Sequence, residues 1–125
     1  MKAKLTLFSI LTILLLIGFG CSNNFEQVGY FKKKLPNGSN DRVFSFYVKN
    51  FSDNEKTWTE IEKFAKRRMY TSGGFTTVFF FNNRHYTPDV TFVAELFDVK
   101  YEKYCVAAYW KYANGHEQFS RYPFK

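Results

Sequence analysis

The sequence predicts an α+β fold: a small two-layer domain with a mainly antiparallel sheet, one or two helices packed on one face, and a C-terminal β-hairpin. Three observations support this prediction. Short segments rich in Phe, Tyr and Val are separated by polar turns, a central segment has apolar residues at helical spacing, and Asn114-Gly115 separates two aromatic segments near the end of the chain. The 125 residues are enough for one domain.

The first two strands are predicted at Val28–Leu35 and Arg42–Lys49. Residues 36–41 between them include Pro, Asn, Gly and Asp, which are typical of a turn. The second strand alternates apolar and more polar residues, so its apolar side chains are expected to share one face. These apolar residues are Phe44, Phe46 and Val48.

A helix is predicted to begin at Ser52, because Ser52 and Glu55 have the spacing of a capping box. It is predicted to end at residues 71–74, Thr-Ser-Gly-Gly. Its apolar residues form one stripe at helical spacing: Trp58, Ile61, Phe64, Ala65 and Met69. The next segment, Phe75–Phe81, is apolar on both faces in its second half and is therefore predicted to be the central strand.

Residues 88–98 allow two interpretations. Thr87, Pro88 and Asp89 have the order of a helix N-terminus. The apolar residues that follow keep near-helical intervals: Val90, Val93, Ala94, Phe97 and Tyr101. A strand is the alternative, because Val90, Phe92, Ala94 and Leu96 also alternate along the chain. We adopt the short helix as the prediction.

The C-terminal hairpin is predicted to consist of Tyr104–Ala113 and His116–Tyr122. Asn-Gly between two such segments is the strongest short signal for a hairpin. If Asn114 and Gly115 are the two loop residues, the register follows directly, and Trp110 lies opposite Phe119.

The first 21 residues have the features of a targeting signal. Lys2 and Lys4 precede an uncharged and largely apolar run over residues 5–19, which is followed by Gly20 and Cys21. This order of charged, apolar and small residues is typical of a signal peptide. Because a cysteine comes directly after the small residue, the segment resembles the type II signal peptide of bacterial lipoproteins.

The resemblance implies how the chain is processed and where it acts. Residues 1–20 are the signal peptide, residues 21–27 are the lipidated Cys21 (palmitate) and a short linker, and residues 28–125 are a single α+β domain. The protein is then expected in the bacterial cell envelope, anchored to a membrane by lipid, with its domain outside the cytoplasm. A disulfide between Cys21 and Cys105 in a secreted, unacylated chain is the alternative.

The chain is basic, with a net charge of +7, which falls to +5 once Lys2 and Lys4 are removed with the signal peptide. In the envelope this charge is expected to meet anionic lipid head groups or an acidic partner, and nucleic acid is not an expected partner. Three consecutive lysines, Lys32–Lys34, end the first predicted strand. They have two interpretations: they contact anionic head groups, or they protect an edge strand from unwanted pairing.

The sequence contains no pattern for catalysis or for cofactor binding. His85 and His116 lack metal-ligand spacing, and neither a nucleophile elbow nor a phosphate-binding loop is present. Cys105 lies in an apolar run and is expected to be a buried thiol. We therefore expect no catalytic residue, no metal and no cofactor. A small hydrolase that uses His85 with Asp89, or with another carboxylate remote in sequence, is one alternative.

Aromatic residues make up 22% of the chain, which is more than a small core buries easily. The candidate binding surface combines aromatic residues of the hairpin with basic residues of the loop after Phe81: Tyr109, Tyr112, Tyr122, Arg84 and His85. Such a surface suits a protein or a polysaccharide. The leading hypothesis is a non-enzymatic binding module. An inhibitor or immunity-type lipoprotein that blocks an envelope enzyme or toxin is the alternative, which a protruding loop would favour.

Overall fold

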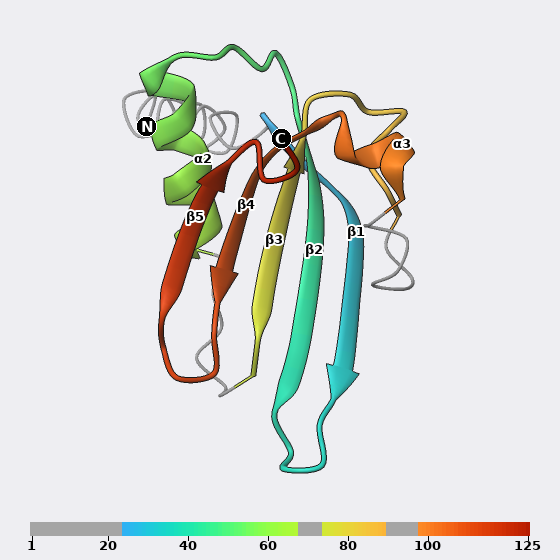
Figure 1. Ribbon diagram of the computed structural model, residues 1–125, viewed down its shortest axis with the longest axis vertical. Helices are drawn as coiled ribbons and strands as arrows, with labels where there is room; N and C mark the ends of the chain where they lie inside the picture. Colours follow the sequence, from blue (N-terminus) through green and yellow to red (C-terminus); the bar gives the residue numbers. More distant parts are fainter. Residues whose placement is uncertain (1–23, 68–73, 90–97) are drawn as a thin grey trace, which may run out of the picture.

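The computed structural model describes residues 24–67, 74–89 and 98–125. Its five-stranded sheet has the strands in chain order (Figure 1). The strands are β1 (Phe25–Lys34), β2 (Asn40–Val48), β3 (Thr76–Phe81), β4 (Cys105–Lys111) and β5 (Glu117–Arg121). The helices are α2 (Glu55–Arg67) and α3 (Val99–Glu102). The predicted order of the five strands, with the main helix between the second and the third, is confirmed.

The sheet is open and mainly antiparallel. β1 pairs with β2, β3 with β4, and β4 with β5 in antiparallel fashion, whereas β2 and β3 are parallel. Parallel neighbours need a long crossover connection, and α2 lies within this one. The predicted α+β class with a C-terminal hairpin is therefore confirmed.

The larger core cluster lies between α2 and the sheet. Trp58, Ile61 and Ala65 of α2 are buried in it, as the helical spacing predicts. Phe80 of β3 has no exposed surface and lies among other aromatic rings. The centroid distances from Phe80 are 6.0 Å to Phe25, 5.9 Å to Phe46 and 6.2 Å to Phe64. The predicted common face of the three apolar β2 residues is confirmed, because Phe44, Phe46 and Val48 all belong to this cluster.

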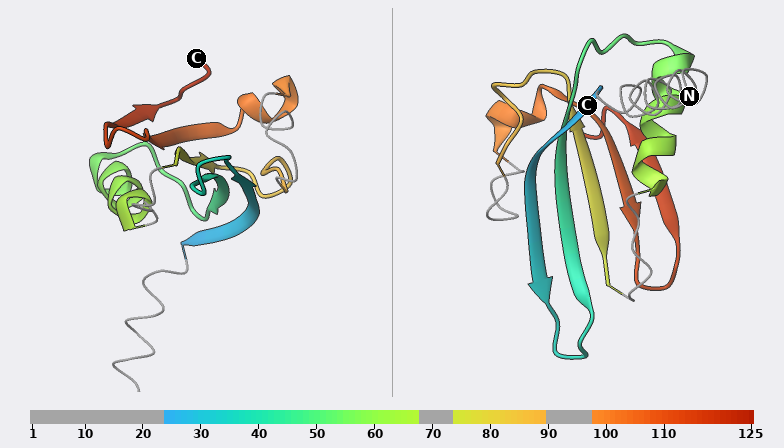
Figure 2. Two further views of the ribbon diagram at one scale, coloured as in Figure 1. Left: turned by 90° about the horizontal axis from the view of Figure 1, so that it is seen from below. Right: turned by 180° about the vertical axis from the view of Figure 1, so that it is seen from behind.

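A second, smaller cluster lies on the opposite face of the sheet, where the short helix α3 is found (Figure 2). Tyr101 of α3 packs against it, and the ring of Phe124 stacks on Phe79 at 6.2 Å. The loop after β3 is fastened to this face, because Ser45 Oγ donates a hydrogen bond to the carbonyl of Pro88 at 2.6 Å. Helix α3 and the loop after β3 lie at the end of the sheet from which β1 starts (Figure 1).

Helix α2 begins at Glu55, and the prediction that it begins at Ser52 is wrong. Asn54 is the N-cap: its Oδ1 accepts a hydrogen bond from the Thr57 amide at 2.9 Å, and its carbonyl accepts one from the Trp58 amide at 3.1 Å. Asn caps a helix as well as Ser does, so the capping-box spacing alone does not decide between the two positions. Met69 and residues 71–73 lie outside the described residues.

The predicted helix start at Thr87 and Pro88 is also wrong. The Thr87 hydroxyl donates to the carbonyl of Asn83 at 2.7 Å, within the loop that follows β3. Helix α3 has Asp98 as its N-cap, whose carboxylate accepts a hydrogen bond from the Lys100 amide at 3.2 Å. Residues 90–97, which carry the helix-or-strand alternative, lie outside the described residues.

The hairpin is present, but its register differs by one residue from the prediction. Trp110 pairs with Gln118 rather than with Phe119, whose partner is Tyr109. The loop has three residues and not two, because the Tyr112 amide donates to the His116 carbonyl at 2.8 Å. Gly115 has φ +86°, which suits a turn that ends in a left-handed residue. A shift of one residue moves a side chain to the other face of a sheet, so Trp110 and Phe119 lie on opposite faces.

Strand β1 begins at Phe25, three residues before the predicted Val28. β1 is an edge strand of the sheet, as the interpretation of Lys32–Lys34 as edge protection requires. All three lysines are exposed. They lie at the opposite end of β1 from Phe25, and therefore at the opposite end of the sheet from the start of the described chain (Figure 1).

Candidate binding surface

The structure does not bring the five predicted surface residues together. Tyr109 is only 2% exposed, because it lies on the face of β4 that packs toward α2. Its ring lies 6.1 Å from that of Phe119 in the same cluster. The prediction that Tyr109 belongs to a binding surface is therefore wrong. Successive side chains of a strand point to opposite faces, and Tyr109 points inward while Trp110 points to the other face.

Tyr122 holds the end of β5 against the start of α2. Its hydroxyl donates to Asp53 Oδ2 at 3.0 Å, and its ring lies 5.5 Å from that of Trp58. Trp58 Nε1 also donates to Asp53, at 2.7 Å. The hydrogen bonds from Trp58 and Tyr122 lower the pKa of Asp53 below its ordinary value. Tyr122 thus has a structural role between two elements.

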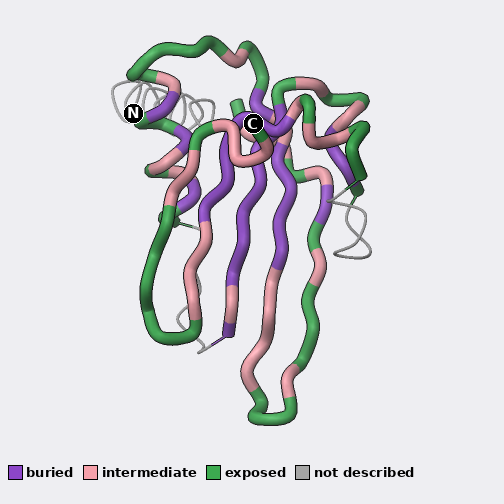
Figure 3. Tube along the Cα trace, in the orientation of Figure 1, coloured by how far each residue is buried: buried purple, intermediate pink, exposed green. Residues whose placement is uncertain are grey.

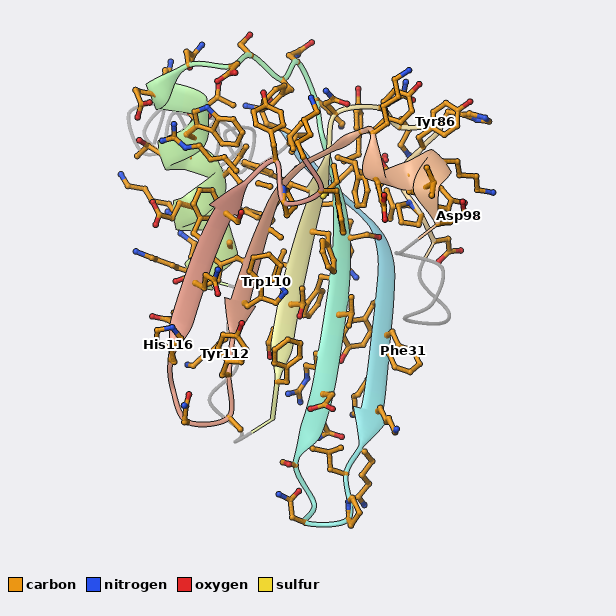
Figure 4. The ribbon with its side chains drawn as sticks, in the orientation of Figure 1. Phe31, Tyr86, Asp98, Trp110, Tyr112 and His116 are labelled. Carbon is orange, nitrogen blue, oxygen red and sulfur yellow. The ribbon has the colours of Figure 1, made fainter. Side chains whose placement is uncertain are left out.

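Arg84 and His85 lie in the loop after β3, as predicted, at the end of the sheet where β1 starts. Arg84 forms an ion pair with Glu26 and so ties this loop to β1. His85 is exposed, with its ring edge against Tyr86 at 4.8 Å. Among the described residues, no hydrogen bond or ion pair joins His85 to Asp89. Figure 4 shows Tyr86 at one end of the sheet and Tyr112 at the other, so the two predicted parts of the surface are far apart.

A different set of side chains comes together on the face opposite α2. One residue from each strand contributes to a row across the sheet, through the register pairs Phe31↔Val43, Val43↔Thr77, Thr77↔Trp110 and Trp110↔Gln118. Val43 and Thr77 in the middle of this row are buried, and Phe31 and Trp110 on either side of them are half-buried. The row therefore presents two aromatic side chains separated by two small ones.

A second group of aromatic side chains lies beside this row, toward the hairpin loops. The ring of Tyr112 lies 5.4 Å from that of Phe75 and 5.7 Å from that of His116, on which it stacks. The Tyr112 hydroxyl donates to the side chain of Gln118 at 3.4 Å. Tyr112 is the one residue of the predicted surface that belongs here. We call the combined set the aromatic face: Phe31, Phe75, Trp110, Tyr112 and His116.

The aromatic face lies in the half of the sheet that is less buried. Buried residues are concentrated in the halves of β2 and β4 nearest α3, whereas partly exposed residues prevail in these two strands toward the hairpin loops (Figure 3). All six residues of β3 are buried. Within residues 24–67, 74–89 and 98–125, no helix lies over this part of the face (Figure 2). Trp110, Tyr112 and His116 lie together on the β4–β5 hairpin, and Phe31 lies across the sheet on β1 (Figure 4).

An exposed lysine stands beside Phe31 at the β1 end of the aromatic face. Lys33 follows Phe31 by two residues and therefore shares its face of the edge strand. Its cross-strand neighbour is Asp41, and Asp41 Oδ1 accepts a hydrogen bond from the Phe75 amide at 3.0 Å. Among the described residues, no ion pair engages Lys32, Lys33 or Lys34. Flat aromatic rings with a neighbouring cation can stack on a ligand and attract negative charge.

Comparison with known proteins was made at three levels. No protein family model, no curated protein and no solved structure matches this chain. The described residues contain no group of three or more His, Cys, Asp or Glu side chains arranged to hold a metal ion. They also contain no helix of the length and apolar character needed to cross a membrane.

Cys105 is buried on the same side of the sheet as the aromatic face, with 2% of its surface exposed. Burial raises the pKa of its thiol to about 12. The thiol therefore stays protonated in neutral solution, and protonated thiols are poor nucleophiles.

We expect iodoacetamide to leave Cys105 unmodified in the folded protein at pH 8 and to modify it fully in denaturant. Mass spectrometry of the peptide that contains Cys105 measures this directly. Alkylation at similar rates in the two conditions would show that the thiol is accessible and ionised in the folded protein.

Proposed function

We propose that this protein is a lipid-anchored binding module of the bacterial envelope, non-enzymatic, which holds its partner on the aromatic face. The observation that carries this proposal is the row of half-buried aromatic side chains on the face of the sheet opposite α2. Half-buried aromatic rings on a flat surface are typical of binding sites, because each ring offers a large contact area that is already held in place. The N-terminal resemblance to a lipoprotein signal supports the anchor and the location.

The position of the aromatic face also supports this function. The described chain starts at one end of the sheet, next to Phe25, and the hairpin loops lie at the other end (Figure 1). Phe31, Tyr112 and His116 are in the half nearer the hairpin loops (Figure 4). An anchor at Cys21 would therefore attach to the end of the sheet opposite the binding surface, and the surface would remain accessible to a partner.

The other two functions have less support. An inhibitor that plugs an active site is favoured by a protruding loop. The β1–β2 hairpin does extend beyond the other strands (Figure 1), but its loop, residues 35–39, has no aromatic side chain, whereas the half-buried aromatic side chains lie on the sheet. A hydrolase requires a carboxylate that orients His85. His85 instead contacts Tyr86 in an exposed loop, and Asp89 is not among its partners.

Replacing Trp110 is expected to abolish partner capture. The full chain, solubilised in detergent and immobilised, would be used to capture components from envelope extract, alongside the Trp110→Ala and Tyr86→Ala variants. Both substitutions remove a half-buried aromatic side chain, but Tyr86 lies at the other end of the sheet. We expect the wild-type chain and Tyr86→Ala to capture the same component, and Trp110→Ala to lose it. Equal capture by all three chains would show that the aromatic face is not the binding surface.

A further inference from the structure

We infer, on the basis of the proposed function, that the aromatic face binds an anionic polysaccharide, which lies across the strands from the β4–β5 hairpin to β1. Three features of the surface lead to this ligand: its shape, the chemical character of its side chains, and the charge at its β1 end.

The shape of the aromatic face is that of a narrow strip. Phe31 and Gln118 mark its two ends, four strand spacings apart. At about 4.8 Å per spacing the strip is roughly 19 Å long, and two rows of side chains on one face make it only about 7 Å wide. A globular protein partner usually covers about 800 Å² on each side of an interface, which is several times this area. The strip therefore fits an extended polymer better than a folded protein.

The side chains of the strip suit sugar rings better than an extended peptide. A peptide that binds in extended form needs partners for its backbone amides and carbonyls, and it finds them at a sheet edge rather than on a sheet face, where the strands already use theirs. A sugar ring stacks its C–H surface on an aromatic ring and points its hydroxyls sideways. Trp110 offers such a ring, and the Gln118 side chain beside it, already an acceptor for the Tyr112 hydroxyl, offers polar atoms to hydroxyls.

The charge at the β1 end selects an acidic polymer. Lys33 stands on the same face as Phe31, and Lys32 and Lys34 are exposed on the other face of the same edge strand. The nearby Asp41 is already a hydrogen-bond acceptor for the Phe75 amide. A carboxylate or sulfate of a polysaccharide that reaches this end would be attracted to the ammonium group of Lys33, and this attraction would weaken as salt is added.

The test uses probes that differ only in charge or only in the presence of sugar rings. Binding of the full chain in detergent to polygalacturonate, to its methyl ester and to poly-L-glutamate is measured by isothermal titration calorimetry. We expect polygalacturonate to bind at least tenfold more tightly than the methyl ester and than poly-L-glutamate. Trp110→Ala should weaken polygalacturonate binding at least tenfold and Lys33→Gln several-fold, whereas Tyr86→Ala should leave it unchanged.

Three results would overturn this inference. Equal binding of the methyl ester would remove the role of charge, and equal binding of poly-L-glutamate with the same dependence on Trp110 would identify an extended acidic polypeptide as the ligand. Absence of polygalacturonate binding, with Trp110-dependent capture of an envelope component preserved, would reject an anionic polysaccharide while leaving the proposed binding module in place. If the protein neither binds polygalacturonate nor captures an envelope component in a Trp110-dependent way, the proposed binding module is rejected as well.

Discussion

Replacing Cys21 with serine is expected to release the full chain from membranes and to remove the added mass of its lipid. The diacylglyceryl group of a lipoprotein, which carries two acyl chains, is attached through the cysteine thiol, which serine lacks. Each CH₂ group buried in the bilayer contributes about 0.8 kcal/mol to membrane binding, so two or three acyl chains anchor the protein stably. Without these chains, this contribution to membrane binding is lost. Membrane fractionation of cells that express the full chain, together with intact mass spectrometry, measures both effects.

Cys105→Ser is the matched control for this experiment, because it also replaces one of the two cysteines of the chain. It should leave both the added mass and the membrane association unchanged. A wild-type protein that is released from cells without added mass, or that contains a disulfide between Cys21 and Cys105, would contradict the proposed anchor. The chain would then be an ordinary secreted protein.

Phe80→Ala is expected to lower the free energy of unfolding by about 3–5 kcal/mol, as is usual for the loss of a fully buried aromatic ring. Phe80 is 0% exposed in the central strand, and three other aromatic rings surround it. Domains of this kind are stable by about 5–15 kcal/mol, so this one substitution removes a large part of the total. Urea unfolding followed by circular dichroism measures the change.

Phe31→Ala provides the comparison, because it removes the same ring from a half-buried position on the edge strand. We expect a loss of roughly 1 kcal/mol there, which is typical of a partly exposed site. If the two substitutions cost the same, the ring of Phe80 would not be the centre of the core.

The strands and the main helix were predictable because their signals are local. Alternation in β2, helical spacing in α2 and the uninterrupted apolar run of β3 each depend only on residues close in sequence. The buried positions of Trp58, Ile61 and Ala65 follow from that spacing alone. Both faces of β3 are covered, as its apolar run predicts, and all six of its residues are buried.

The hairpin register was not predictable, because Asn-Gly is compatible with both a two-residue loop and a three-residue loop. The structure adopts the longer loop, with Tyr112 and His116 as the closing pair and Gly115 at positive φ. The difference is one residue in sequence, but it places Phe119 opposite Tyr109 on the face toward α2 and leaves Gln118 beside Trp110 on the other face. The start of α2 was missed for a similar reason, since Ser52 and Asn54 are both good N-caps.

The aromatic face was not predictable as a set. Its members come from β1, from the residue before β3 and from the β4–β5 hairpin, and they meet only because the strands are ordered as in Figure 1. The parallel pairing of β2 with β3 decides this arrangement, and no local pattern specifies which strand pairs with a strand that follows a helix. The sequence did indicate a surplus of aromatic residues, and Tyr112 was found from its place in the hairpin.

With a lipid at Cys21, the start of β1 at Phe25 would limit how far the aromatic face can lie from the bilayer. Only four residue steps separate Phe25 from Cys21, and a fully extended chain covers at most about 14 Å in four steps. The ten residues of β1 add roughly 33 Å at the usual rise of a strand. A lipid at Cys21 would hold the domain close to the membrane, because the connecting segment is short. The aromatic face would then lie less than about 50 Å from the membrane surface. A ligand of the aromatic face would then have to come within this distance of the membrane, because the anchored protein cannot bind it farther away.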